Sequence, residues 1–184
     1  FKHIFKEVLK IDLKKFPVMT YDKAMSRYGT DKPDLRFSLE LIDVTDIASK
    51  SDFQVFKGAE KIKCINPKDM SRKEIDSLID FAIKESAKGM AWMRVTDKGL
   101  ESNIAKFFSD DIQKQLIKKA EAKKGSVLFF IADKEKIVHD ILGKLRSEVA
   151  QRQNLIKEKE FKFLWVTDFP LFEFDEDSES WIPC

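Results

Sequence analysis

Two amphipathic helical patterns, each beside a short apolar run, limit the fold more than any other feature of the chain. The first begins with the capping box Ser71-Arg72-Lys73-Glu74 and places apolar residues at helical spacing, from Ile75 to Ile83. Lys88-Gly89 ends this pattern, and residues 90–95 then have the composition of a buried strand. The second pattern, residues 137–149, follows the apolar run 127–131, and Asp133 is the expected N-cap between them.

The remaining patterns around these two helices complete an alternating order. Residues 53–56 and 62–65 read as two strands of a hairpin with a longer loop, and residues 109–120 predict a further helix. The order is two strands, a helix, a strand, an excursion with a helix, a strand and a helix. We therefore expect an α+β fold, a two-layer ββαββα sandwich whose antiparallel sheet carries its helices on one face.

Shorter elements are predicted on both sides of this unit. Residues 1–10 favour a short helix, and a second helix, residues 21–28, begins at the cap Thr20 and ends at Gly29. Residues 37–44 suggest a strand or an extended segment. Residues 161–166 return to strand composition before Asp168-Phe169-Pro170 breaks the pattern.

Alternating charges mark the segment that follows Gly29. Asp31, Lys32, Asp34 and Arg36 lie around Pro33, which disfavours helical geometry at the residue before it. One interpretation is a solvated charged turn. The other is a set of ion pairs that fixes two domains against each other, in which Arg36 or Lys32 pairs with Asp31, Asp34 or a carboxylate near Asp168.

Composition indicates a globular chain with little long-range attraction for polyanions. Hydrophobic residues make up 43% and charged residues 36% of the 184 residues, and the formal net charge is +2. Cys64 and Cys184 are the only cysteines, so neither a disulfide framework nor a zinc site is indicated, and a cytoplasmic location is expected. No apolar run has the length of a membrane span. The chain begins with Phe1 rather than Met, and we expect it to be a piece of something longer.

Motifs for self-contained catalysis or metal binding are missing from the sequence. His3 and His139 are interpreted as exposed or packed histidines, because metal-ligand spacing is lacking around them. Asp175-Glu176-Asp177 is interpreted as a solvated turn rather than a metal site. The lysines at 118, 119, 123 and 124 suit a solvated helix end, with a phosphate-backbone patch as the alternative. We assign no catalytic, cofactor-binding or metal-binding residue.

Four long segments carry a resemblance to a known family. FPVMTYDKAMSRYGTDKPDLRF (16–37) and LWVTDFPLFEFDED (164–177) resemble the segments through which bacterial-type aspartyl-tRNA synthetases leave and re-enter their class II core. Residues 71–95 and 125–146 resemble the inserted GAD (DCoH-like) domain of that family. The resemblance divides the chain into a core segment, 1–36, the GAD domain, 37–150, and a linker with the returning core segment, 151–184.

The resemblance implies a ligase that activates aspartate with ATP and magnesium and transfers it to tRNA in the cytoplasm. Such an enzyme is expected to be a homodimer without membrane association, whereas this fragment is expected to be a monomer. The family's catalytic motifs flank this region, so the fragment itself is expected to be inactive. Six residues remain as candidates for a structural role at the domain junction: Asp31, Lys32, Asp34, Arg36, Asp168 and Glu173.

Two other functions stay open at this point. The first is a non-catalytic tRNA-binding GAD module, as in a subunit of a tRNA-dependent amidotransferase, although the flanks resemble the synthetase core. The second is a small-molecule regulatory domain of two-layer α+β type, because a fold does not determine function. A pocket with convergent polar groups would favour it.

Overall fold

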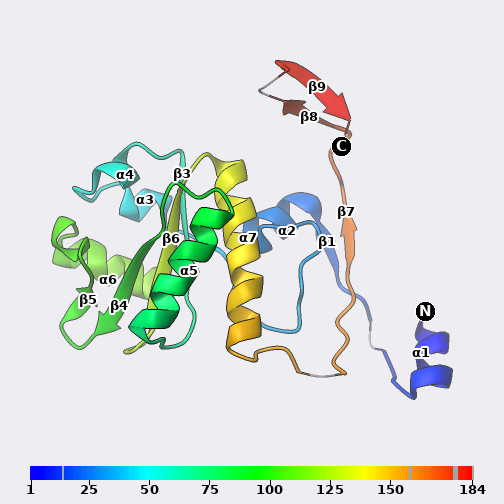
Figure 1. The fold of residues 1–184 in the computed structure, drawn as a ribbon. Helices are drawn as coiled ribbons and strands as arrows, with labels where there is room; N and C mark the ends of the chain where they lie inside the picture. The colour runs from blue at the N-terminus through cyan, green and yellow to red at the C-terminus, as the bar shows by residue number, and fades with distance from the viewer. Residues whose placement is uncertain (14, 158, 176–177, 184) are drawn as a thin grey trace.

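A five-stranded antiparallel sheet forms the centre of the computed structural model, which describes residues 1–13, 15–157, 159–175 and 178–183 (Figure 1). Its strands lie in the order β2-β3-β6-β4-β5. Their bounds are Ile42–Asp43 for β2, Lys61–Ile65 for β3, Ala91–Thr96 for β4, Gly99–Glu101 for β5 and Val127–Asp133 for β6. The α+β class expected from the sequence is confirmed.

Side chains alternate along β6 between two apolar clusters, which explains why its sequence is continuously apolar. Val127, Phe129 and Ile131 belong to the first cluster, beneath the long helices α5 (Arg72–Lys84) and α7 (Glu135–Arg152). Leu128 and Phe130 belong to the second, on the other face. That face is covered by shorter elements that the sequence analysis did not foresee as a layer: α3 (Thr45–Ala48), α4 (Gln54–Lys57), the 3₁₀ turn η1 (Ala105–Phe107) and α6 (Asp110–Lys119).

Several helix ends lie where the sequence places them. Ser71 and Glu74 form the predicted capping box of α5, and the Ser109 side chain caps α6. Helix α2 (Tyr21–Tyr28) begins at Thr20, whose hydroxyl accepts from the Lys23 amide, and ends at Gly29.

Three local predictions were wrong or too broad. The strand expected at residues 53–56 is replaced by helix α4, with Phe53 at its N-cap, and the rings of Phe53 and Phe56, three residues apart, meet edge to face on one side of this turn. Asp133 is the last residue of β6 and not the N-cap; helix α7 begins at Glu135, and its N-cap residue, Lys134, makes no side-chain cap hydrogen bond. In the 37–44 segment only Ile42–Asp43 pairs, since Leu39 has a positive φ of 87° that breaks the extended backbone.

The flanking segments meet each other beside α2, on its side away from α7 (Figure 1). Strand β1 (Val18–Thr20) pairs in parallel with β7 (Trp165–Thr167), with Val18 opposite Trp165. Helix α1 (Lys2–Leu9) precedes this pair, and the hairpin of β8 (Phe172–Asp175) and β9 (Ser180–Pro183) follows it. Within the described ranges, none of the helices combines the length and apolarity that a membrane span requires.

Candidate domain junction

Helix α2 meets α7 through direct backbone contact between two glycines. A Cβ atom on Gly29, whose φ is 70°, would lie 2.1 Å from the carbonyl oxygen of His139. A Cβ atom on Gly143 would lie 2.6 Å from the carbonyl oxygen of Gly29. Only glycine at both positions allows this approach, so the pair fixes where the end of α2 crosses α7. Sequence reasoning identified Gly29 as a helix end but missed Gly143.

Arg146 of α7 holds the irregular segment that follows α2. Its side chain is buried, with 1% exposure, and it donates to the carbonyl oxygens of Asp34 (2.6 Å), Phe37 (3.2 Å) and Leu39 (3.0 Å). The guanidinium also lies 4.0 Å from the ring centroid of Phe37 and 4.9 Å from that of Tyr28. Burial lowers the pKa of Arg146. Carbonyl dipoles and ring faces therefore stabilise a charge that is largely removed from water.

The sequence contained one signal for this role that was not used. Arg146 directly follows Leu145, which belongs to the apolar stripe of this helix. A charged side chain buried beside such a stripe needs hydrogen-bond or ion-pair partners. The pattern could not show that the partners are backbone carbonyls about a hundred residues away.

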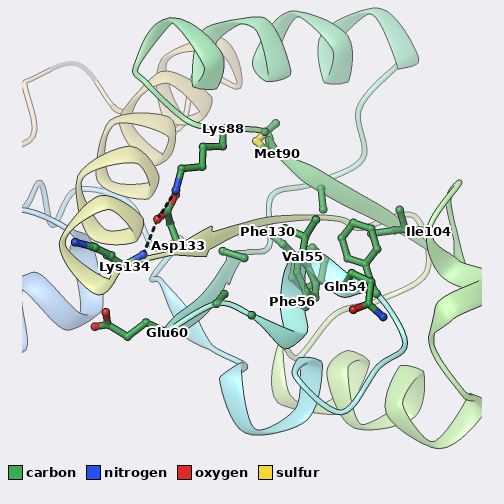
Figure 2. Close-up of a pocket in the computed structure, with 16 residues that line it drawn as sticks. Gln54, Val55, Phe56, Glu60, Lys88, Met90, Ile104, Phe130, Asp133 and Lys134 are labelled. Atoms are coloured by element: carbon green, nitrogen blue, oxygen red, sulfur yellow. Dashed lines mark hydrogen bonds and ion pairs between the residues drawn. The ribbon is translucent and has the colours of Figure 1, made fainter.

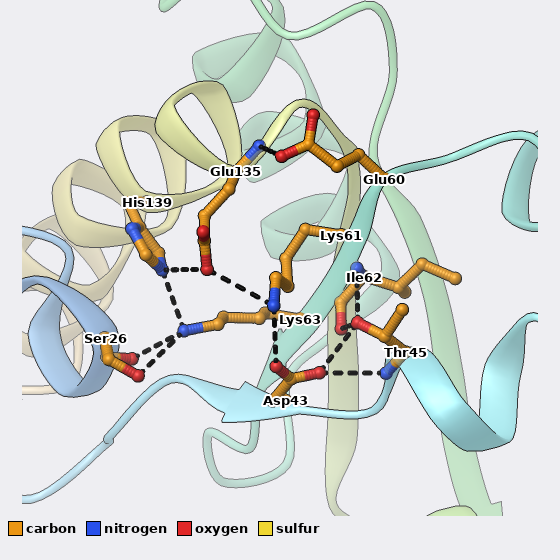
Figure 3. Close-up of polar contacts among 9 residues, drawn as sticks. All are labelled: Ser26, Asp43, Thr45, Glu60, Lys61, Ile62, Lys63, Glu135 and His139. Carbon is orange, nitrogen blue, oxygen red and sulfur yellow. Dashed lines mark hydrogen bonds and ion pairs between the residues drawn. The ribbon is translucent and has the colours of Figure 1, made fainter.

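A second buried cation reaches α2 from the sheet (Figure 3). Lys63 of β3 is 1% exposed, and its Nζ atom lies 2.8 Å from the carbonyl oxygen of Ser26, 3.3 Å from the Ser26 hydroxyl and 2.8 Å from Nε2 of His139. Burial lowers the pKa of Lys63, and burial followed by the Lys63 charge lowers the pKa of His139. This geometry fits a Lys63 ammonium that donates to a neutral His139 ring.

Two carboxylates, those of Glu135 and Asp43, lie near the contact between Lys63 and His139. Glu135 lies 3.8 Å from Nε2 of His139 and 3.3 Å from Nζ of Lys61, which in turn lies 3.3 Å from Asp43 (Figure 3). Asp43 also accepts from the amide and hydroxyl of Thr45. The cluster thus links β2, β3 and α7 through charged side chains. Lys63, the most deeply buried of them, extends the link to Ser26 of α2.

The six junction candidates from the sequence fall into three separate places. Asp34 and Arg36 pair with each other at 2.7 Å, and this contact lowers the pKa of Asp34, chiefly through the hydrogen bond from Arg36. Lys32 lies 3.9 Å from Asp31 but is largely exposed. These pairs remain within their own segment.

The two candidates of the returning segment make their contacts away from residues 31–36. Asp168 is exposed, has a φ of 57° and accepts from the hydroxyl of Thr167 at 3.1 Å. Glu173 of β8 instead pairs with Lys136 of α7 at 3.1 Å. The structure therefore brings Glu173 to the helix of the central domain, whereas Asp168 makes a local turn contact.

Arg27 and Glu40 close the loop between α2 and β2. The guanidinium of Arg27 binds both oxygens of Glu40, at 2.5 and 2.8 Å, and the Tyr28 hydroxyl lies 3.3 Å from the same carboxylate. The amide of Leu41 donates to the Arg27 carbonyl at 2.8 Å. The pKa of Glu40 is lowered, mainly by its hydrogen bond with Arg27.

This set of contacts is suited to positioning α2 and the segment after it against α7. Its two buried cations bind protein groups, and among the described residues no group of three or more His, Cys, Asp or Glu side chains lies close enough to hold a metal ion. Glu176 and Asp177, two of the three acidic residues interpreted as a solvated turn, lie outside the described residues. His139 is buried, so it is a packed histidine rather than an exposed one, the two interpretations that the sequence left open.

Comparison with known proteins identifies the domain that α7 and the sheet belong to. Residues 54–142 match the GAD domain family. The chain is 50% identical over 181 residues to an aspartate–tRNA(Asp/Asn) ligase of Brachyspira hyodysenteriae, covering 94% of this chain and 31% of that protein. It is 45% identical to the corresponding ligase of Caldanaerobacter subterraneus and 43% identical to an aspartate–tRNA ligase of Ruminiclostridium cellulolyticum, each over 98% of this chain and 32% of the relative.

The chain thus spans about a third of the length of these relatives. The similarity includes the flanks as well as the central domain, because it covers almost the whole chain whereas the domain match covers residues 54–142. The amidotransferase alternative gains no support from these matches. The chain therefore carries a GAD domain within a segment of aspartate–tRNA ligase type.

Proposed function

We propose that this chain is the GAD-bearing segment of a class II ligase that joins aspartate to tRNA through an aspartyl-adenylate, with ATP. The observation that carries the proposal is similarity at 43–50% identity over nearly the full chain, flanks included, to aspartate–tRNA ligases. A free-standing GAD module would have no need of the flanking segments.

The proposed organisation is a core segment at 1–36, the GAD domain at 37–150 and a linker with a returning core segment at 151–184. The parallel pair of β1 and β7 supports it, since Val18 and Trp165 lie opposite each other although the sheet domain lies between them in sequence. A domain inserted into a core must leave and return at neighbouring points. The junction contacts of Gly143, Arg146 and Lys63 would then set the orientation of the insertion.

The proposal places the catalytic groups of the enzyme outside this segment. Adenylate formation needs positioned cations for the ATP phosphates and carboxylates for magnesium. The buried cations Lys63 and Arg146 are bonded to backbone carbonyls, and the described residues offer no metal-binding cluster. ATP, magnesium, aspartate and tRNA are thus proposed partners of the whole enzyme, a cytoplasmic homodimer. The segment alone would be a monomer without ligase activity.

A chimera tests this function directly. The corresponding third of the Brachyspira hyodysenteriae ligase is replaced by this chain, and aspartate-dependent exchange of labelled pyrophosphate into ATP is measured beside the unaltered enzyme and the isolated chain. We expect the chimera to work within about tenfold of the unaltered enzyme and the isolated chain to be inactive. A folded, dimeric chimera without exchange would contradict the assignment, and exchange by the isolated chain would contradict the placement of the catalytic groups.

A further inference from the structure

A cavity of about 680 Å³ lies on the α4 side of the sheet, away from the junction (Figure 2). Its wall includes the rings of Phe56 and Phe130, both 1% exposed, together with Val55, Met90 and Ile104. This volume is within the range of small-molecule sites, and buried aromatic rings are typical of their walls. None of the junction contacts uses these residues.

The cavity exists because β4 leaves its neighbour β6 before β6 ends. Ala91 opposite Phe130 is the final pair of β4 with β6 on this side, whereas β3 stays paired up to Asp133. The register would next place Gly89 opposite Ala132, and both residues line the cavity. A Cβ atom built on Gly89 would meet nothing within 4 Å, so the space beside this stretch of β6 is open.

Hydrogen-bond alternation shows which way the backbone of Ala132 points. The Val44 amide donates to the Ile62 carbonyl, so the backbone N–H and C=O of Ile62 point towards β2. Because this direction alternates along a strand, even-numbered residues of β3 bond to β2 and odd-numbered residues bond to β6. Because Lys63 lies opposite Ile131, odd-numbered residues of β6 bond towards β3 and even-numbered ones towards β4. The amide and carbonyl of Ala132 therefore face the open side.

No backbone hydrogen bond within the described ranges links Ala132 to Gly89. An amide N–H and a carbonyl with this orientation form the pattern that an extended peptide group pairs with when a strand is added to a sheet. The donor and the acceptor stand next to the apolar wall that holds Phe56 and Phe130.

Charges at the rim of the cavity are balanced. Lys88 pairs with Asp133 at 2.9 Å, and Glu60 and Lys134 lie nearby (Figure 2). Two positive and two negative groups give no net attraction for a polyanion such as a nucleotide, whereas a neutral ligand meets no repulsion.

We propose that this cavity binds a small neutral ligand in which two peptide-like amide groups flank one branched apolar side chain. The carbonyl and the N–H on either side of the carbon that bears this side chain accept from the Ala132 N–H and donate to the Ala132 carbonyl, as one residue of an antiparallel strand would in the place that β4 vacates. The side chain lies against Phe56, Phe130 and Ile104. This site is independent of the junction and of the ligase function proposed above.

Nuclear magnetic resonance titration of the ¹⁵N-labelled chain tests the proposal with three probes. The first, N-acetyl-L-leucine N′-methylamide, has both features. N-acetylglycine N′-methylamide lacks the side chain, and O-acetyl-L-leucic acid N-methylamide carries an ester oxygen in place of the N–H that donates to Ala132. We expect the first probe to shift the Ala132 and Gly89 amide signals saturably, and the other two to bind at least about tenfold more weakly. Equal binding of the three probes, or no saturable shift at Ala132, overturns the proposal.

Two exposed apolar residues give a matched pair of variants. Val55 lines the cavity and is 58% exposed, whereas Ile83 of α5 is 52% exposed and lies outside the cavity lining. Val55→Asp is expected to weaken binding of the first probe about tenfold, and Ile83→Asp to leave it unchanged. Gly89→Leu, which fills the opening from the other side, is expected to give the same loss as Val55→Asp. Binding that neither cavity variant weakens places the probe elsewhere and overturns the proposal.

Discussion

The Nη2 atom of Arg146 lies 2.6 Å from the carbonyl oxygen of Asp34, 112 residues earlier in the chain. The same guanidinium bonds the carbonyls of Phe37 and Leu39, so one side chain of α7 binds three points of a segment with little regular structure. Backbone carbonyls in such a segment have no ladder partners of their own. The position of this segment therefore depends on a helix that folds from a distant part of the sequence.

Replacing Arg146 with methionine is expected to lower the free energy of unfolding by at least about 2 kcal/mol, since each buried carbonyl left without a donor costs about 1–3 kcal/mol. Methionine fills part of the space, so the loss reports on hydrogen bonds more than on volume. Urea titration monitored by circular dichroism measures the change. Arg152→Met serves as the control, because Arg152 of the same helix binds the Glu148 carboxylate and the Ser77 hydroxyl at a partly exposed site, and it is expected to change stability by no more than about 1 kcal/mol. Equal losses from the two substitutions would show that the hydrogen bonds from Arg146 to the carbonyls add nothing to the free energy of unfolding.

At Gly143, the expected effect of alanine on stability is opposite to the effect that helix propensity alone predicts. Alanine is favoured over glycine inside a helix by about 0.8–1.0 kcal/mol, so Gly143→Ala in an isolated α7 would be stabilising. Here the added Cβ would lie 2.6 Å from the carbonyl oxygen of Gly29, and α2 must move away. We expect faster hydrogen exchange in residues 21–28 and a lower unfolding midpoint. Gly89→Ala, which meets nothing within 4 Å, is the control. Unchanged exchange in α2 would contradict the close contact.

The pair of Arg36 and Asp34 is expected to contribute little, despite its place in the charged segment. Both side chains are about one-third exposed, at 35% and 27%, and they belong to the same short stretch of chain. Arg36→Ala should lower the free energy of unfolding far less than Arg146→Met does, because solvent screens this pair. Thermal unfolding of both variants in the same buffer makes the comparison. A larger loss from Arg36→Ala would restore this pair as the main contact of the junction.

Local sequence signals predicted those parts of the fold that local chemistry determines. The capping box at Ser71, the cap at Thr20 and the glycine end at Gly29 each rest on residues within one turn of each other, and each is confirmed. The strand expected at 53–56 was wrong, because a short run with three apolar residues fits a strand and a helical turn equally well. Contact with the second cluster, through Phe56, decides the outcome.

The junction could be predicted only in outline. The charged residues at 31–36 include Asp34, whose carbonyl Arg146 binds, but their charges pair locally. The contacts that join α2 and this segment to α7 come from Lys63, Gly143 and Arg146, each of which reads in sequence as an ordinary member of a strand or helix. Their partners are mostly backbone carbonyls, which are identical in every residue and leave no sequence signature.

The buried contact of Lys63 with His139 makes the stability of the chain depend on pH in a defined direction. The pKa of His139 is lowered from its ordinary value of 6.5, first by burial and then by the Lys63 charge. The groups that face it are Lys63 and Lys61 of β3, Glu135 of α7, Asp43 of β2 and the Ser26 carbonyl and hydroxyl of α2. A proton on Nε2 would remove the acceptor of Lys63 and place two positive charges 2.8 Å apart.

Because the folded-state pKa lies below the unfolded one, the unfolded chain binds more protons as pH falls below about 6.5, and stability decreases in that window. The contribution of His139 is fully present above the ordinary histidine pKa of 6.5 and is lost as pH falls from there through the lower folded-state pKa, with a slope of at most about 1.4 kcal/mol per pH unit. Urea unfolding at several pH values measures this slope for the wild type and for His139→Gln, whose side chain does not titrate. His3→Gln removes the other, exposed histidine and serves as the matched control. We expect His139→Gln to flatten the pH dependence and His3→Gln to leave it intact; the same slope in all three proteins would show that His139 is protonated as readily in the folded chain as in the unfolded one.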